Sequence, residues 1–449
     1  MELDMTKGNP LKLIIRFMVP LIIGNIFQQL YNMADTIIVG RYVGVKALAA
    51  VGSTGTIMFL IIGFMQGMTT GFTILTSQRF GSGDMAGLRK SVGNAAVLSA
   101  IVTIIGTIVS VYFMDGLLKL MNTPSDIFQD AKEYITIICI GLVCNILYNL
   151  LASILRAVGN SKVPLYFLVV AAVMNVFLDL FFIIQFNMGV AGAAWATVIS
   201  QGVSGILCLL YIMKKVPVIH IKKEDWKLDY YCVRNQISIG IPMALQFSIT
   251  AIGTILVQSA LNMLGSVAVA AYTAAGKVEQ FVTQPFLALG MTMATYCAQN
   301  TGVDDVERVR KGVRIANIMS AIYGVCIAFV VVAAMPYLVT LFVTGDAGEI
   351  IQYANTYIRI TSVFFVPLGL IFIFRNVFQG CGYSFVPLMG GVVELLSRAV
   401  LAFVAASLLS FKGVCFANAA AWITAGGYLG IAYLFAIRKW QKTGSIFKR

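Results

Sequence analysis

The sequence predicts an all-α integral membrane protein with twelve transmembrane helices, arranged as two six-helix bundles related by an axis along the membrane normal. Three observations support this prediction: an apolar composition, apolar runs of membrane-spanning length, and an internal repeat. Of the 449 residues, 59% are hydrophobic and only 11% are charged, and the mean hydropathy is +0.88. Soluble domains carry roughly 25% charged residues, so the composition excludes a soluble fold.

Apolar runs of about 20 residues, the length that crosses roughly 30 Å of hydrocarbon, recur along the chain. The first run follows a basic start, as in a signal peptide, but it is too long for one and shows no small-residue cleavage pattern. We therefore expect it to stay in the protein as the first helix. The twelve runs lie near residues 13–38, 48–76, 92–113, 134–155, 163–186, 190–213, 237–262, 268–296, 313–342, 354–378, 386–409 and 414–437.

The second half of the chain repeats the first. The segment "SQRFGSGDMAGLRKSV" (77–92) returns as "AQNTGVDDVERVRKGV" (298–313). The matched positions are loop glycines, polar residues and basic pairs, so chance similarity between apolar helices does not explain them. Each repeat holds an even number of helices, which gives both halves the same orientation in the membrane. Nearly the same offset pairs "GNSKVPLY" (159–166) with "GYSFVPLM" (382–389), and Pro20 with Pro242.

The longest polar segment, "KKVPVIHIKKEDWKLDYY" (214–231), separates the two repeats. The predicted organisation is therefore an N-terminal six-helix bundle (1–213), a cytoplasmic linker (214–234) and a C-terminal six-helix bundle (235–449). Two bundles around a central cleft suit transport by alternating access.

The net charge of +13 is explained by membrane topology rather than by nucleic-acid binding. With both termini inside, roughly two dozen Lys and Arg residues fall on the inner side and about five on the outer side, as the positive-inside rule expects. We therefore expect a multi-pass protein of the inner (plasma) membrane, with cytoplasmic termini and no nucleic-acid partner. We also expect the protein to be monomeric. The outer set is Arg41, Lys46, Lys119, Lys132 and Lys412.

Cysteine and histidine usage argues against metal chemistry. The eight cysteines form no CxxC pair and fall mostly within apolar runs, so neither a disulfide framework nor a metal cluster is indicated. The single histidine, His220, lies in the linker, which excludes a histidine proton relay through the membrane. We expect no cofactor and no enzymatic activity.

Polar residues form stripes along several of the apolar runs. In the first run, Asn25, Gln28, Asn32 and Asp35 are spaced by three, four and three residues, which places them on one helix face. Interhelical hydrogen bonding explains any single amide equally well. Stripes in both halves, however, favour a shared polar cavity, because lipid does not tolerate such faces. The predicted substrate cavity comprises Gln28, Asn32, Asn145, Asn149, Gln246, Gln258, Glu279, Gln280 and Gln284.

Two acids stand out within these stripes. Asp35 lies inside the first run, and Asp179 lies on the fifth run together with Asn175, four residues earlier. A carboxylate in hydrocarbon must be protonated, paired or bound to a cation. Both acids are therefore candidates for handling a cation.

The other charged residues of the apolar runs can be interpreted as structural. Glu394 and Arg398 are four residues apart and are expected to form an intrahelical ion pair. Arg375 lies near the inner end of its run and is expected to extend to the membrane surface. Lys277 and Glu279 are two residues apart and so point away from each other; Glu279 has either a structural partner or a role in cation binding.

These residues resemble the multidrug and toxic compound extrusion (MATE) family of transporters, prokaryotic type, over nearly the whole chain. The resemblance rests on the two repeats, on Pro20, on "YNMADTIIVGRYVGVKALAAVG" (31–52) and on "RAVGNSKVPLY" (156–166). It implies a cation-coupled antiporter, driven by H⁺ or Na⁺, that exports amphipathic and mostly cationic organic compounds.

The resemblance also implies a coupling site. In related prokaryotic members, an aspartate of the first helix works with an Asn and an Asp of the fifth and a Thr of the sixth. Another branch of the family carries carboxylates in its seventh and tenth helices, and this sequence has none in 237–262 or 354–378. The matching positions here are Asp35, Asn175, Asp179 and Thr197, of which Asp35, Asn175 and Asp179 would hold Na⁺.

Three alternatives remain open from the sequence. A flippase for a lipid-linked oligosaccharide would need cationic cavity residues, whereas the candidate cavity holds acids and amides. A membrane-embedded enzyme lacks a histidine or metal cluster to carry its chemistry. A channel would conduct without saturation and without dependence on an ion gradient.

Overall fold

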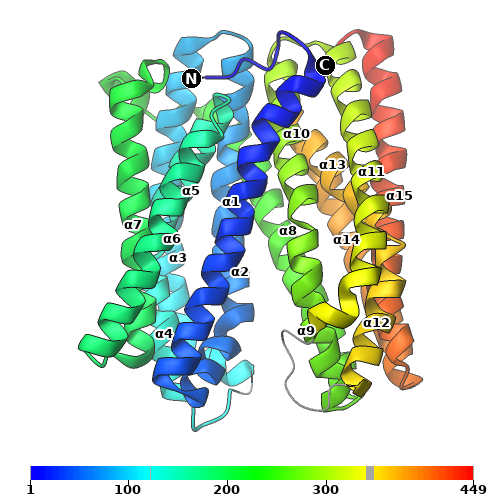
Figure 1. The fold of residues 1–449 in the computed structure, drawn as a ribbon. Helices are drawn as coiled ribbons and strands as arrows, with labels where there is room; N and C mark the ends of the chain where they lie inside the picture. Colours follow the sequence, from blue (N-terminus) through cyan, green and yellow to red (C-terminus); the bar gives the residue numbers. More distant parts are fainter. Residues whose placement is uncertain (1, 122, 340–347, 448–449) are drawn as a thin grey trace. The chain divides into compact units, whose positions relative to one another are not determined.

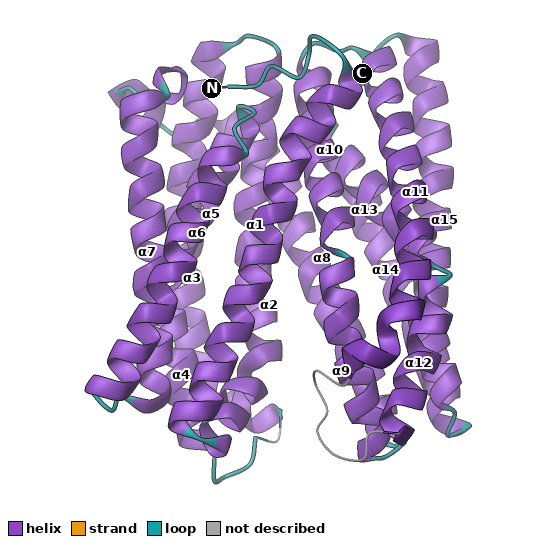
Figure 2. Ribbon diagram, viewed as in Figure 1, coloured by secondary structure: helices purple, strands orange, loops and turns teal. Residues whose placement is uncertain are grey.

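The computed structural model describes residues 2–121, 123–339 and 348–447. Every regular element in these ranges is a helix (Figures 1 and 2). The first half contains α1 (Pro10–Ile38), η1 (Val39–Val43), α2 (Val45–Gly81), α3 (Met85–Leu120), α4 (Phe128–Ile140), α5 (Leu142–Ala157), α6 (Lys162–Leu180), η2 (Phe181–Gln185) and α7 (Gly189–Lys215). After the short turns η3 (Pro217–Ile219) and η4 (Lys223–Trp226) come α8 (Tyr230–Asn262), α9 (Ser266–Val282), α10 (Gln284–Gly302), α11 (Val306–Val339), α12 (Gly348–Ser362), α13 (Phe365–Gly380), α14 (Phe385–Ser407) and α15 (Phe411–Thr443).

The helices account for the predicted membrane spans. Among the described residues, nine helices are long and apolar enough to cross a membrane, and the number rises to eleven if two bent pairs each count as one span. The bends are 46° between α4 and α5 and 54° between α12 and α13. The predicted run 313–342 lies on α11, and its last three residues are outside the described ranges.

A further predicted span is divided between two helices that do not count as a bent pair. The run 268–296 falls on α9 and α10, which are separated at Thr283. Pro285 stands at the start of α10, where a missing backbone N–H is tolerated but would interrupt a continuing helix. The resulting α9, with 17 residues, is shorter than a full membrane crossing.

The chain forms two compact units. Residues 1–4 and 19–247 make up the first unit, and residues 5–18 and 248–449 make up the second. The helices α1 and α8 are each divided between the units, and each contains an internal proline, Pro20 and Pro242, close to the point of division. The predicted domain boundaries at 213 and 235 stay a prediction.

Within the first unit, the start of α8 packs very closely on α2. A Cβ atom added to Gly71 would lie 2.5 Å from the Cα atom of Gly240, and one added to Gly67 would lie 2.7 Å from the Cα atom of Ala244. Only glycine permits such an approach between helix backbones. Gln236, which is fully buried, donates to the carbonyl oxygens of Phe72 and Ser91 and so fixes the position of α8 along this contact.

The linker is also fixed to the first unit, along α3. The buried Asn94 accepts a hydrogen bond from the backbone N–H of Asp229 at 2.9 Å and donates to the carbonyl oxygen of Lys227 at 3.3 Å. Lys90 donates to the Asp229 carboxylate at 3.0 Å, and this hydrogen bond lowers the pKa of Asp229 below its ordinary value. The linker therefore follows a defined path along the start of α3.

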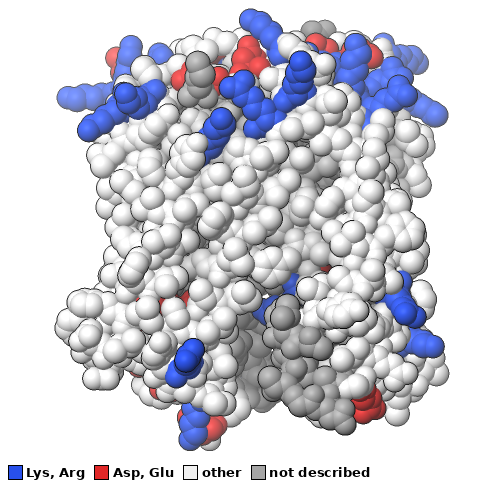
Figure 3. Space-filling model, in the orientation of Figure 1, with Lys and Arg blue, Asp and Glu red and all other residues white. Residues whose placement is uncertain are grey.

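Basic side chains gather at one end of each unit (Figure 3). In the first unit they lie over the end of α7, where Lys214 and Lys215 are located. In the second unit they lie over the start of α11 and the end of α15. Each unit thus carries the uneven distribution of positive charge that a membrane protein needs to insert with a defined orientation.

Candidate functional site

The first unit brings two buried carboxyl groups together. Asp35 comes from the last third of α1 and Asp179 from the end of α6, and their exposed fractions are 8% and 0%. A side-chain hydrogen bond joins them. Two carboxyl groups share a hydrogen bond only when one of them carries a proton, so the pair is suited to holding a proton or a cation.

The two other residues nominated from the sequence lie in the same cluster. Asn175 is one helical turn before Asp179 on α6 and is fully buried. With its amide nitrogen toward Asp179, Asn175 donates to Asp179 Oδ2 at 3.0 Å and accepts from the backbone N–H of Thr197 at 3.3 Å. With the amide reversed, its nitrogen donates to Thr197 Oγ1 at 3.4 Å. The structure therefore assembles Asp35, Asn175, Asp179 and Thr197 into one site.

Two tyrosines complete the cluster, and sequence reasoning missed both. Tyr31 lies one turn before Asp35 on α1, hydrogen-bonds to Thr197 through its side chain and interacts electrostatically with both acids. Tyr134 comes from α4, is 3% exposed and also lies in the electrostatic field of the acids. The four-residue spacing between Tyr31 and Asp35 could have identified Tyr31. Nothing in the local sequence identifies Tyr134, because the packing of α4 in the folded unit brings it near the acids.

Each acid is closely followed by a π-helical segment. η1 begins four residues after Asp35, η2 begins two residues after Asp179, and the two segments contact one another. Wider turns of this kind often occur at functional sites, where they displace side chains from the regular helical positions. Here both helices leave the α-helical geometry directly beyond the acid that they carry.

The chemistry of the cluster suits a proton or a hard cation. Its polar atoms are carboxylate, amide, hydroxyl and phenol groups, and oxygen ligands are those that hard cations prefer. Asp35 Oδ1 and Asp179 Oδ1 are buried and have no hydrogen-bond partner among the described residues. The described residues contain no group of three or more His, Cys, Asp or Glu side chains that could hold a metal ion. The oxygen ligands of the cluster fit H⁺ or Na⁺, and the role of the site stays a prediction.

The predicted cavity residues of the first unit differ in their exposure. Gln28 and Asn32 are exposed on α1, whereas Gln246 is 5% exposed on α8. Asn149 donates to both the carbonyl and the side-chain oxygen of Asn145 at 2.9 Å. These hydrogen bonds use part of the donor and acceptor capacity of the two side-chain amides. Fewer of their polar groups therefore remain to bind a ligand.

The second unit contains the other predicted cavity residues. Gln258 is exposed and donates to Asn262, and Gln284 donates to the carbonyl oxygen of Gln280 at 2.8 Å. Glu279 accepts a hydrogen bond of 2.7 Å from the Tyr357 hydroxyl. Glu279 thus has a structural partner, which was one of the two predicted readings.

The charged residues of α13 and α14 confirm one prediction and correct another. Arg398 and Glu394 form the predicted intrahelical pair, at 2.7 Å. Arg375 does not extend to the membrane surface: its Nη2 atom lies 2.9 Å from Glu394 Oε2, and its side chain is only 14% exposed. The prediction failed because it considered α13 alone, whereas the partner of Arg375 is on α14.

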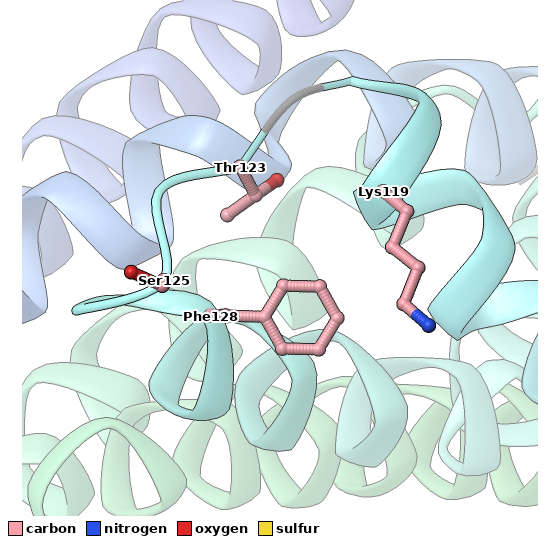
Figure 4. Close-up of a pocket in the computed structure, with 4 residues that line it drawn as sticks. All are labelled: Lys119, Thr123, Ser125 and Phe128. Atoms are coloured by element: carbon pink, nitrogen blue, oxygen red, sulfur yellow. The ribbon is translucent and has the colours of Figure 1, made fainter.

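A separate pocket of about 490 Å³ lies between the end of α3 and the start of α4 (Figure 4). Lys119, Thr123, Ser125 and Phe128 line it, and the figure shows the ring of Phe128 between the two hydroxyl residues and Lys119. None of the predicted site residues lines this pocket. The candidate site is therefore the acidic cluster.

Comparison with known proteins gives consistent results. The MatE family model matches residues 20–181 and 242–404, one match in each sequence repeat. The chain is 28% identical to the Probable multidrug resistance protein YpnP of Bacillus subtilis over 438 residues, which cover 96% of this chain and 94% of the relative. It is 24% identical to the Probable multidrug resistance protein NorM of Thermotoga maritima over 399 residues, which cover 88% of this chain and 85% of the relative.

A solved structure also has the same fold. A MOP-superfamily transporter from Pyrococcus furiosus, described as having a binding pocket of reverse polarity that suggests a different function, has a TM-score of 0.92. Its sequence is 22% identical, and the match covers 98% of both chains. This likeness confirms the predicted fold class.

Proposed function

This chain belongs to the MatE family of multidrug and toxic compound extrusion transporters, and we propose that it exports amphipathic, mostly cationic organic compounds in exchange for H⁺ or Na⁺. The observation that carries the proposal is the hydrogen-bonded pair of Asp35 and Asp179, buried in membrane-spanning helices. The drug-export names of the relatives support the substrate class.

The acid pair supports coupling because the proton or Na⁺ that it binds can be exchanged during transport. Two buried carboxyl groups that share one proton can release it and take up Na⁺ or a second proton when the cavity opens to the other side. Because Asn175 contacts both Asp179 and Thr197, a change in charge at the acids alters hydrogen bonds between α6 and α7. Such differential contacts are required if a bound ion is to favour one conformation over the other.

The test is transport by purified protein in liposomes under imposed gradients. A cationic dye such as ethidium is expected to move against its own gradient when a proton or sodium gradient is applied, and to stop when the gradient is collapsed. Flux that does not saturate and ignores both gradients would indicate a channel. Translocation of a lipid-linked oligosaccharide without any dye transport would favour the flippase instead.

We propose further that the protein lies in the plasma membrane with both termini and the linker cytoplasmic, as the Lys and Arg distribution suggests. Lys223 is an exposed residue of the linker. In a variant without native cysteines, cysteine introduced at Lys223 should resist a membrane-impermeant thiol reagent on intact cells and react after permeabilisation. Cysteine at Lys46, an exposed residue at the opposite end of α2 from the 82–84 turn, is the matched control and should react from outside. The reverse labelling pattern would invert the proposed orientation.

Glu279 is proposed to contribute less to coupling than the acids of the first unit. Its carboxylate is already bonded to Tyr357, and it has no second acid beside it on α9. Glu279→Gln should therefore change the affinity for some cationic substrates several-fold while gradient-driven transport stays measurable. Complete loss of transport for every substrate, with normal amounts of folded protein, would place the coupling site in the second unit.

A further inference from the structure

The second unit has a groove of about 350 Å³ between α11 and the bend that joins α12 to α13. The helix α11 contacts both α12 and α13 (Figure 1). None of the predicted cavity or coupling residues lines the groove. Its lining is mostly apolar, and the polar side chains that line it are those of Arg359 and Ser362, both on α12.

The apolar walls of the groove are exposed. Val325 and Phe329 of α11 are 50% and 75% exposed, and Val363, at the bend, is 70% exposed. The helix α11 is long and apolar enough to cross a membrane, and α12 and α13 pass the same test together as a bent pair. Exposed apolar surface of this kind marks a membrane contact or a ligand-binding groove. An acyl chain therefore suits these walls.

Arg359 gives this apolar groove a positive charge. It is exposed in the last turn of α12, and within the described ranges its side chain forms no ion pair and no hydrogen bond. A guanidinium beside hydrocarbon is costly unless it reaches water or an anionic partner. Ser362 is three residues later and so lies on the same side of α12. The groove thus combines an apolar wall with a cation whose donors are unused.

The direction of α12 matches the two ends of a phospholipid. The helix begins at Gly348, eleven residues before Arg359, which is about 16 Å along the axis. Helical side chains lean toward the N-terminus of their helix, and a long arginine can extend from the hydrocarbon toward the headgroups. Arg359 is therefore directed toward the membrane surface at which α12 begins. Val363 lies beyond Arg359, farther from that surface, where an acyl chain would run.

We propose that this groove binds one anionic phospholipid of the surrounding bilayer, with its phosphate on Arg359 and an acyl chain along Val325, Phe329 and Val363. The inference goes beyond the proposed export function and does not depend on it. A guanidinium fork binds phosphate oxygens through paired, charge-assisted hydrogen bonds, and basic pockets between membrane helices are suited to anionic headgroups. Burial of the chain does not distinguish headgroups, so Arg359 provides the selectivity for negative charge.

Two lipids with identical acyl chains provide the test. Native mass spectrometry of the purified full-length protein compares the binding of phosphatidylglycerol, which is anionic, with that of phosphatidylcholine, whose phosphate is offset by a cation. The unmodified protein should retain one phosphatidylglycerol with about tenfold higher affinity, as expected for a charge-assisted hydrogen bond. Arg359→Gln should remove this preference and change phosphatidylcholine binding by less than about twofold. Because Arg359 is exposed, the variant should fold normally.

Three further variants separate the two parts of the site. Arg359→Lys keeps the charge but loses the planar fork, so its affinity for phosphatidylglycerol should be intermediate. Ala328→Phe places a ring in the groove, which Ala328 lines, and should weaken the binding of both lipids. Lys412→Gln is the matched control, because Lys412 is an exposed basic residue at the start of α15 and does not line the groove. It should leave the binding of both lipids unchanged.

Unchanged phosphatidylglycerol binding in Arg359→Gln or in Ala328→Phe would overturn the proposal. Equal weakening by Lys412→Gln would do the same, because it would show a general attraction to surface charge. Displacement of phosphatidylglycerol by an equal concentration of oleate would assign the groove to a free fatty acid instead. Since binding is measured without substrate or gradient, a failure of coupled export would leave this result intact and contradict only the proposed function.

Discussion

Asp35→Asn is expected to abolish gradient-driven export while the protein still folds and inserts. The amide keeps the volume of the side chain and can donate a hydrogen bond to Asp179, its partner in the structure. It cannot titrate or carry a negative charge, so the exchange of H⁺ or Na⁺ is lost. Replacing a buried acid by a neutral amide also removes a desolvation cost, so the melting temperature should stay the same or rise. The measurement is dye export per folded molecule in liposomes under an imposed gradient.

Asp179→Asn should have the same effect, and the double variant should be little worse than either single variant, because residues that act as a unit are not additive. Asp115→Asn is the matched control. Asp115 is an exposed acid of α3 whose partner is Lys132, and its replacement should leave transport unchanged. Near-normal coupled export by Asp35→Asn would disprove the mechanism. Lost expression with unchanged transport per folded molecule would assign the acids a structural role only.

Gly71→Ala is expected to cause a large loss of stability in the first unit. The new Cβ would lie 2.5 Å from the Cα atom of Gly240 and 2.8 Å from its backbone nitrogen. Backbone atoms cannot turn aside as a side chain can, so α2 and α8 must separate, at a cost of about 3 kcal/mol. The expected result is a clearly lower melting temperature in detergent and a reduced yield of monodisperse protein.

Gly52→Ala on the same helix is the control for this substitution. Nothing lies within 4 Å of its added Cβ, and alanine favours a helix over glycine by about 1 kcal/mol. Gly52→Ala should therefore be neutral or stabilising. If both variants melt at the same temperature, α2 and α8 do not approach as closely as the structure shows.

Different physical effects explain what the sequence could and could not predict. Hydropathy located the spans, because every lipid-facing residue must be apolar and every backbone group must be bonded within its own helix. It could not locate the bend after Ile140 between α4 and α5, since Gly141 at that bend lies in a run that is apolar on both sides. The composition of an apolar run shows that the run lies in lipid. It does not show where the helix bends within the membrane.

The candidate site shows the same limit. The spacing of Asn175 and Asp179 already placed them on one helix face, and the family resemblance added Asp35 and Thr197. Tyr134 was missed because its contribution depends on the packing of α4. Arg375 was interpreted incorrectly for the same reason, since its partner is on the next helix. Contacts within a helix are visible as spacing in the sequence, whereas contacts between helices are not.

The close packing of α8 on α2 also has a consequence for synthesis. Chains emerge from the ribosome N-terminus first, and domains generally fold in that order. The first unit, however, includes residues up to 247, with Gln236 bonded to Phe72 and Ser91 and Gly240 seated on Gly71. The first six membrane spans therefore stay incompletely packed in the bilayer until the ribosome has synthesised the linker and the start of the seventh span. A ribosome that stalls at the end of the first repeat would leave a chain whose glycine-lined surface is uncovered and open to quality-control proteases.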